Sequence, residues 1–145
     1  MSRWKPEWDE ERQEYYAQLR ELESIPGELL TKYKDAKLIN LDRNKISELS
    51  DDHIKHWNHV TYLGLWDNNL SSLPEHIGEL QTLTGLYVNA NPLKSLPRSL
   101  MDLPNLESFI CESIPGVIDR IVRIVENRQG IIELWKEIFT GQYMK

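Results

Sequence analysis

Three stretches of the sequence repeat one pattern at a nearly fixed spacing, and this repeat restricts the possible folds more than any other feature. They are AKLINLDRNKISELSDDHI, VTYLGLWDNNLSSLPEHI and LTGLYVNANPLKSLPRSL. Each has two apolar residues two positions apart, an asparagine three residues later, an apolar residue two beyond it and a leucine three beyond that. The asparagines are Asn44, Asn68 and Asn91, so the periods are 24 and 23 residues. Such a period predicts a stack of similar coils.

Within each copy, the alternation of residues predicts a short strand followed by a turn. In YLGLWD, Leu63 and Leu65 share one face of the strand, and Tyr62, Gly64 and Trp66 share the other. An asparagine side chain has two donor hydrogens and an acceptor oxygen, so a column of asparagines can satisfy the backbone of successive turns. No coil can bury its apolar edge alone, and we therefore expect the coils to stack.

The repeat also predicts which side chains face inward. Their positions are Ile39, Leu41, Ile46, Leu49, Leu63, Leu65, Leu70, Leu73, Ile77, Leu80, Leu83, Leu86, Val88, Leu93, Leu96, Leu100, Leu103 and Leu106. A fourth strand, LESFICES, keeps Phe109 and Cys111 at the same offsets. Ile114 stands where the next asparagine would be, so we expect the repeats to end there.

With these copies in register, the sequence resembles the leucine-rich repeat family. The last two copies continue with LPEHIGELQTL and LPRSLMDLPNL, similar to the L-P-x-x-[IL]-x-x-L-x-x-L class of intracellular members, and the resemblance covers residues 36–113. It implies an α/β fold, a short solenoid of about four coils with parallel β-strands on its concave face. In this family such modules act as adaptors, as inhibitors, or as bacterial effectors that bind a host protein.

The two ends of the chain are expected to close the solenoid with helices, giving one domain over residues 1–145. Residues 1–35 predict an N-terminal helical cap, because Pro6 suits a first helical position. Its apolar residues fall on one helical stripe: Trp8, Tyr15, Leu19 and Leu22. Residues 114–145 predict a C-terminal cap of two amphipathic helices, VIDRIVRIVENR and IIELWKEIF.

Composition excludes several partners and compartments. The 145 residues carry a net charge of −6 and no run of lysine or arginine, so neither nucleic acid nor a membrane surface is an expected partner. No secretion signal and no apolar run long enough to span a membrane is visible. The single cysteine, Cys111, fits a reducing compartment. We expect a cytoplasmic protein, or one translocated by a specialised bacterial secretion system.

Residues that could carry catalysis or bind a metal give weak signals. His53, His56 and His59 are spaced three apart, so on a helix the outer two point in different directions, and a solvated surface explains them. Cys111 takes an inward position with no neighbouring base, where burial makes a thiol inert. No phosphate-binding loop, HExxH or GxSxG motif occurs. The sequence predicts no enzyme, no metal site and no cofactor.

The remaining candidate is the concave face, made by the outward residues of the strands. Tyr62, Trp66 and Tyr87 lie on adjacent strands and are expected to cluster, as aromatic residues do in interface hot spots. Asp42, Asp67 and Glu112 favour a partner with lysine or arginine. The candidate binding residues are Tyr62, Trp66, Tyr87, Asp42, Arg43, Asp67, Asn89, Ile110 and Glu112.

The function predicted from these residues is non-catalytic binding of another protein, of adaptor or effector type, with a basic or amphipathic partner surface. A dedicated inhibitor or immunity protein that blocks an enzyme or toxin is the alternative. The aromatic residues could instead fill the groove structurally, and the acidic run WDEERQE could contact a basic partner. A monomer is expected in preference to an oligomer.

Overall fold

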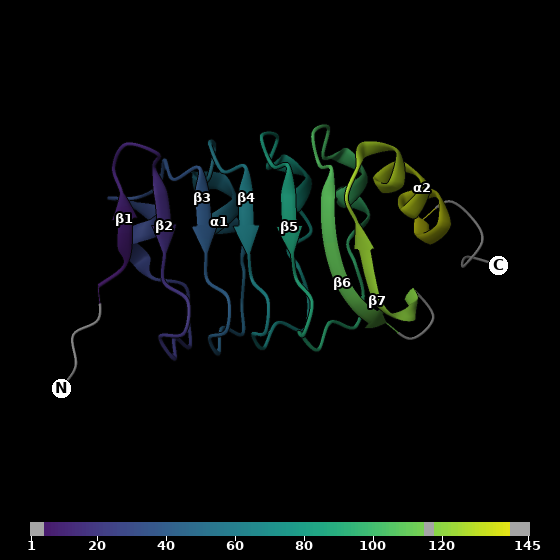
Figure 1. The fold of residues 1–145 in the computed structure, drawn as a ribbon, viewed down its shortest axis with the longest axis horizontal. Coiled ribbons are helices and arrows are strands. Elements are labelled where there is room, and N and C mark those ends of the chain that lie inside the picture. The colour runs from purple at the N-terminus through teal and green to yellow at the C-terminus, as the bar shows by residue number, and fades with distance from the viewer. Residues whose placement is uncertain (1–4, 115–117, 140–145) are drawn as a thin grey trace.

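The strands form one continuous sheet in chain order. The computed structural model describes residues 5–114 and 118–139, and within them the sheet has seven strands in the order β1 to β7 (Figure 1). The strands are β1 (Glu7–Asp9), β2 (Glu14–Tyr16), β3 (Leu38–Asn40), β4 (Tyr62–Gly64), β5 (Gly85–Tyr87), β6 (Ser108–Ile114) and β7 (Ile118–Val125). Strands β2 to β6 are parallel, whereas β1 and β7 run antiparallel to their neighbours.

Short helices return the chain behind the sheet from one strand to the next. They are η1 (Gly27–Leu30), α1 (Asp51–His56), η2 (Ile77–Glu79) and η3 (Arg98–Asp102), and α2 (Arg128–Phe139) follows the last strand (Figure 1). The tight η2 and η3 turns follow the LP pairs of the repeat, where proline fixes the backbone of the first turn. Each coil is therefore a strand, a turn, a short helix and a return.

Every inward position predicted from the repeats is buried. The most exposed of them, Leu96, keeps 8% of its surface, and most keep none. The columns follow the register of the strands, in which Ile39 pairs with Leu63, Leu63 with Leu86 and Leu86 with Phe109. Phe109, Cys111 and Ile114 are buried as well. The predicted stack of coils is confirmed.

The helix predicted over the N-terminal cap is wrong. Residues 7–16 form β1, a turn and β2, and β2 pairs in parallel with β3, so Tyr15 lies beside Ile39. Tyr15 and Ala17 are fully buried where the repeats have Ile39 and Leu41, and Leu19 is 59% exposed. The segment is thus an additional coil with Arg20 in place of the asparagine. The strand forms in place of the helix because the backbone N–H and C=O groups along the edge of β3 would otherwise lack hydrogen-bond partners.

At the C-terminus one of the two predicted helices is wrong and the other is confirmed. Residues 118–125 of the segment VIDRIVRIVENR form β7, which pairs with β6, and β-branched isoleucine and valine favour a strand. The segment IIELWKEIF lies in α2. Residues 115–117 and 140–145 of this predicted cap lie outside the described residues.

Helix α2 closes the C-terminal end of the core. Its Trp135 packs edge-on against Phe109 of β6, with ring centres 5.3 Å apart. One nitrogen of Arg128, Nη1, donates to the carbonyl oxygens of Leu103 and Leu106 at 3.1 and 2.9 Å, which ties the start of the helix to the last coil. Among the described residues, no helix is long and apolar enough to cross a membrane.

Candidate binding surface

The outward side of the sheet is not covered by any helix of the described chain, because the helices lie behind the strands (Figure 1). We call it the open face; it corresponds to the face predicted to be concave. It consists of the outward side chains of β1 to β6 and the residue two beyond each of β2 to β5. These residues are Glu7, Asp9, Glu14, Tyr16, Gln18, Leu38, Asn40, Asp42, Tyr62, Gly64, Trp66, Gly85, Tyr87, Asn89, Ser108, Ile110 and Glu112.

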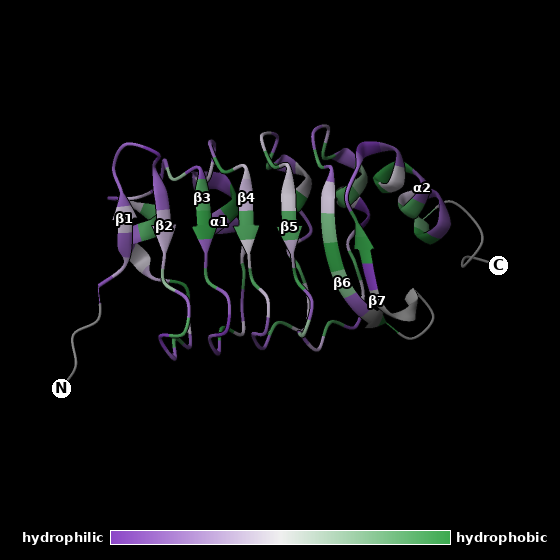
Figure 2. Ribbon diagram, in the orientation of Figure 1, coloured by the Kyte–Doolittle hydropathy of each residue, from purple (hydrophilic) through white to green (hydrophobic). Residues whose placement is uncertain are grey.

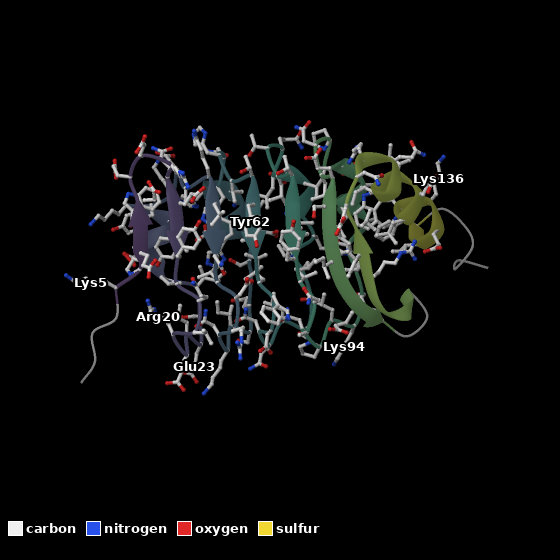
Figure 3. The ribbon with its side chains drawn as sticks, viewed as in Figure 1. Lys5, Arg20, Glu23, Tyr62, Lys94 and Lys136 are labelled. Carbon is white, nitrogen blue, oxygen red and sulfur yellow. The ribbon has the colours of Figure 1, made fainter. Side chains whose placement is uncertain are left out.

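Two tyrosines lie in contact at the middle of the open face, where Figure 3 labels Tyr62. The ring centres of Tyr62 and Tyr87 are 4.9 Å apart with planes at 40°. The strand register places Gly85 beside Tyr62 and Gly64 beside Tyr87. A Cβ atom added to Gly85 would lie 3.1 Å from the Tyr87 ring, so the missing side chains give the rings room to lie along the sheet.

Both tyrosines are held by polar neighbours. The Tyr87 hydroxyl and the Ser108 hydroxyl share a hydrogen bond of 2.6 Å. Burial raises the pKa of Tyr62 to about 12, and the nearby Asp42 carboxylate adds to this effect. The half-buried ring of Tyr62 therefore stays neutral at physiological pH, as a flat apolar surface with a polar tip.

Asp42 is half-buried and holds the end of the neighbouring strand. Its Oδ1 accepts a hydrogen bond of 2.9 Å from the backbone N–H of Trp66. Burial raises the pKa of the Asp42 carboxyl, and this hydrogen bond opposes the rise. In the same way, Oε1 of Glu112 accepts the N–H of Ala90 at 3.0 Å. Two of the acids predicted to attract a partner thus also bond the adjacent coil.

Trp66 belongs to a second cluster, at the ends of the strands. Its side chain is 39% exposed, and the guanidinium carbon of Arg43 lies 5.6 Å from its ring centre. Arg43 also pairs with Asp67, with Nε and Oδ2 3.9 Å apart. Among the described residues, the ring of Trp66 contacts neither the ring of Tyr62 nor that of Tyr87. The structure therefore brings the two tyrosines together and places Trp66 with Arg43 instead.

The open face extends further than the sequence indicated. Ile110 of β6 pairs with Ile124 of β7, which is 56% exposed, so an apolar row continues from Tyr87 to the edge of the sheet. Ile124 was missed because its segment was interpreted as a helix, although strict alternation would have placed it outward. Tyr16, on the additional coil, was missed for the same reason. In Figure 2 apolar residues reach into β6 and β7, whereas β1 is hydrophilic.

The charge on this face has one sign. The residues that define the open face include carboxylates and no lysine or arginine, the acids being Glu7, Asp9, Glu14, Asp42 and Glu112. Across the described residues, none of these acids is in an ion pair. Such a surface attracts cationic groups and repels anionic ones.

The three repeat asparagines lie inside the coil turns rather than on the open face. Each is buried, and each Nδ2 donates both to its own turn and to the preceding coil; for Asn91 the acceptors include the Val88 and Leu65 carbonyls at 3.1 and 2.8 Å. Its Oδ1 accepts the N–H of Leu70 at 2.9 Å. Asn44 and Asn68 make equivalent bonds. Asn89, two residues before Asn91, is on the open face and half-exposed.

The histidines and the cysteine of the described chain form no common site. Among the described residues, no group of three or more histidine, cysteine, aspartate or glutamate side chains could hold a metal ion. His53 packs against Trp57, with ring centres 5.5 Å apart, and His59 approaches Asp35. Cys111 is buried, and burial raises the pKa of its thiol to about 12, which keeps it protonated.

Known proteins resemble this chain in part. Lumican of Oryctolagus cuniculus is 35% identical over 83 residues, which are 56% of this chain and 40% of lumican. TMV resistance protein N of Nicotiana glutinosa is 37% identical over 90 residues, 61% of this chain and 8% of that protein. The platelet glycoprotein Ib alpha chain of Mus musculus is 30% identical over 113 residues, 74% of this chain and 15% of that protein. The chain thus spans less than half the length of these relatives.

A solved structure also resembles this chain. A leucine-rich repeat protein of Leptospira interrogans matches with a TM-score of 0.53 and 25% identity, over 68% of this chain and 32% of that one. No family model matches the sequence. The repeat of 23 to 24 residues, the buried asparagine column and the parallel coils agree with these similarities. The chain is a leucine-rich repeat protein.

Proposed function

We propose that the chain binds a partner protein through the open face, without catalysis, as an adaptor or effector. Leucine-rich repeat domains are generally protein-interaction modules and are typically non-catalytic. The observation that carries this proposal is the pair of half-buried tyrosines, Tyr62 and Tyr87, on a face whose own charged residues are all acidic. We place the protein in the cytoplasm, or in a bacterial secretion route, with no nucleic acid or membrane as partner.

The residues of the open face indicate what kind of partner surface would fit it. Tyrosine and tryptophan contribute strongly to hot spots, since they bury much area and lose little side-chain entropy. Tyr62, Tyr87 and Ile110 offer an apolar centre, and Glu14 and Glu112 lie around it. The partner therefore has an apolar strip flanked by lysine or arginine. Opposite charge speeds encounter and selects orientation more than it adds affinity.

Two matched pairs of variants test this proposal. Tyr87→Ala combined with Trp66→Ala removes exposed aromatic surface from the open face, whereas Met101→Ala removes an exposed apolar side chain from η3 on the other side. Glu14→Lys and Glu79→Lys make the same charge change on the open face and on the back. Tagged variants with unchanged circular dichroism are used to capture partners from a native lysate, followed by mass spectrometry.

We expect the open-face variants to lose partners that the back-face variants retain. Retention of every partner by the Trp66 and Tyr87 double variant would sink the proposal. The alternative, an inhibitor or immunity protein, shares the same face. It is favoured if the captured partner is an enzyme or toxin whose activity falls when the chain is added.

A further inference from the structure

A pocket lies at the N-terminal end of the solenoid, away from the open face. It forms between the turn joining β1 to β2 and the segment of residues 31–37 that leads into β3, and its volume is about 440 Å³. The lining residues are Trp8, Glu10, Gln13, Lys32, Tyr33 and Asp35. Neither the repeat nor the proposed function accounts for this combination of aromatic and charged side chains.

Two aromatic rings form one side of the pocket. The ring centres of Trp8 and Tyr33 are 4.7 Å apart with planes at 41°, and both side chains are half-buried. Tyr33 also packs against the buried ring of Tyr15 at 5.4 Å. Tyr15 is fixed in turn, because its hydroxyl donates a hydrogen bond of 3.1 Å to Glu28. The rings are therefore supported from the core, and both side chains line the pocket.

The charged groups of the pocket favour a cation. The carboxylate of Glu10 accepts the indole N–H of Trp8. Asp35 approaches Lys34 at 3.4 Å and His59 at 3.8 Å. The ammonium of Lys32 lies 5.2 Å from the ring centre of Tyr33 and makes no ion pair in the described part of the chain. The pocket thus already holds one cation of the chain itself against an aromatic face.

We propose that this pocket receives an arginine side chain from a partner protein. Aromatic faces attract cations through the negative charge above the ring. A guanidinium group is planar, stacks on such faces and can also bond carboxylates in its own plane, whereas a lysine ammonium does neither so well. Trp8 and Tyr33 supply the faces and Glu10 supplies the carboxylate. Lys32 is the competing cation, and it leaves the Tyr33 ring when arginine binds.

The simpler interpretation is that Trp8 and Tyr33 only cover the end of the core. Under that interpretation the pocket binds nothing, and changes at Glu10 or Lys32, which are exposed, leave ligand titrations unchanged. Binding of a small probe therefore separates the two interpretations. This test is independent of the proposed function of the open face, because it uses a small probe and not the partner protein.

The probe is N-acetyl-arginine amide, and its control is N-acetyl-citrulline amide, which has the same shape but no charge. The readout is the NMR signal of the Trp8 indole N–H, assigned with Trp8→Phe. We expect saturable shifts with the arginine probe and none with citrulline. Glu10→Gln should weaken binding several-fold, and Lys32→Gln should tighten it two- to three-fold because the competing cation is gone.

Lys55→Gln, the same change on α1, is the matched control and should leave the titration unaltered. Tyr33→Leu should abolish binding, with circular dichroism and thermal melting confirming that the fold is retained. If Tyr33→Leu does not fold, the Glu10 and Lys32 variants still decide the question. Equal shifts with the arginine and citrulline probes, or no saturation with either, would overturn the proposal, as would an unchanged affinity in both Glu10→Gln and Lys32→Gln.

Discussion

At the scale of single residues, chemically equal side chains have different tasks because of their place in the coil. Asn89 and Asn91 are two positions apart in one turn. Asn91 is buried and bonds the backbone of two coils, whereas the Asn89 side chain is on the open face. The repeat spacing, rather than residue type, distinguishes them.

Asn91→Ala should lower the free energy of unfolding by about 1 to 3 kcal/mol, because the Leu70 N–H and several carbonyls lose their buried partner. Asn89→Ala should change it by less than about 0.5 kcal/mol, as most surface substitutions do. Urea unfolding followed by circular dichroism measures both. Equal midpoints for the two variants would contradict the separation of roles.

Gly64→Ala should lower the free energy of unfolding by about 1 to 3 kcal/mol, since overpacking forces neighbours to move. The new Cβ would lie 2.8 Å from Oδ1 of Asp42 and 3.2 Å from the Tyr62 ring. Gly27→Ala is the control, because its Cβ would meet nothing within 4 Å. If urea midpoints fall equally for both variants, the crowding at Gly64 is not the cause.

Asp42 should make stability depend on pH. Its pKa is raised in the folded protein, so folding favours the protonated form; its stabilising contribution is present below the unfolded pKa and is lost as pH rises through the folded pKa. Asp42→Asn keeps an oxygen for the Trp66 N–H without a buried charge. We expect this variant to have a higher urea midpoint than the parent at pH 7 and no such advantage at pH 3. A gain of the same size at both values would refute this account.

At the scale of elements, the repeats could be predicted, whereas the ends could be predicted only in part, since α2 is confirmed and the other helices expected there are strands. Ile39, Leu63 and Leu86 recur in register, so each copy supports the interpretation of the others. The N-terminal segment has no such support: Tyr15, Leu19 and Leu22 fit a helical stripe, and the alternation of Tyr15 and Ala17 fits a strand equally well. Pairing with β3 decides between them, and that contact is not local in sequence.

For the binding surface too, the residues on the repeat strands could be predicted, and those outside the repeats could not. Tyr62 and Tyr87 lie on repeat strands, so their contact follows from the register. Ile124 lies on a strand that matches no repeat, and the position of Trp66 beside Arg43 depends on side-chain geometry at the strand ends. The pocket formed by Trp8 and Tyr33 depends on the N-terminal coil, whose strand pairing the sequence did not reveal.

Helix α2 should depend on Arg128 for its attachment. Arg128→Ala leaves the carbonyls of Leu103 and Leu106 without their donor, which should cost about 1 to 3 kcal/mol if water does not replace it. Hydrogen exchange should then speed up in α2 more than in β3 to β5. Gln129→Ala, at an exposed position of the same helix, is the control. Uniform acceleration over the chain would indicate global destabilisation instead.

At the scale of the whole molecule, the charged side chains on the outward side of β1 to β6 form one acidic surface. The acids of the open face include Glu7 on β1 and Glu112 on β6, so a partner meets the same sign of charge along these strands. The proposed association should therefore slow as salt rises, because ions screen charges that are more than about 10 Å apart at 0.1 M. Stopped-flow measurement with a captured partner should show a lower association rate at 0.5 M than at 0.05 M salt. A rate independent of salt would exclude steering by this face.

The reversed strands at the two ends also bear on assembly. A stack of parallel coils has a first and a last surface that match each other, and matching surfaces of this kind lead to open-ended filaments. Here β1 runs antiparallel to β2, and β7 runs antiparallel to β6, so the strand at each end is reversed relative to the parallel strands between them. A further coil in the direction of β2 to β6 would therefore meet an antiparallel neighbour at either end of the sheet.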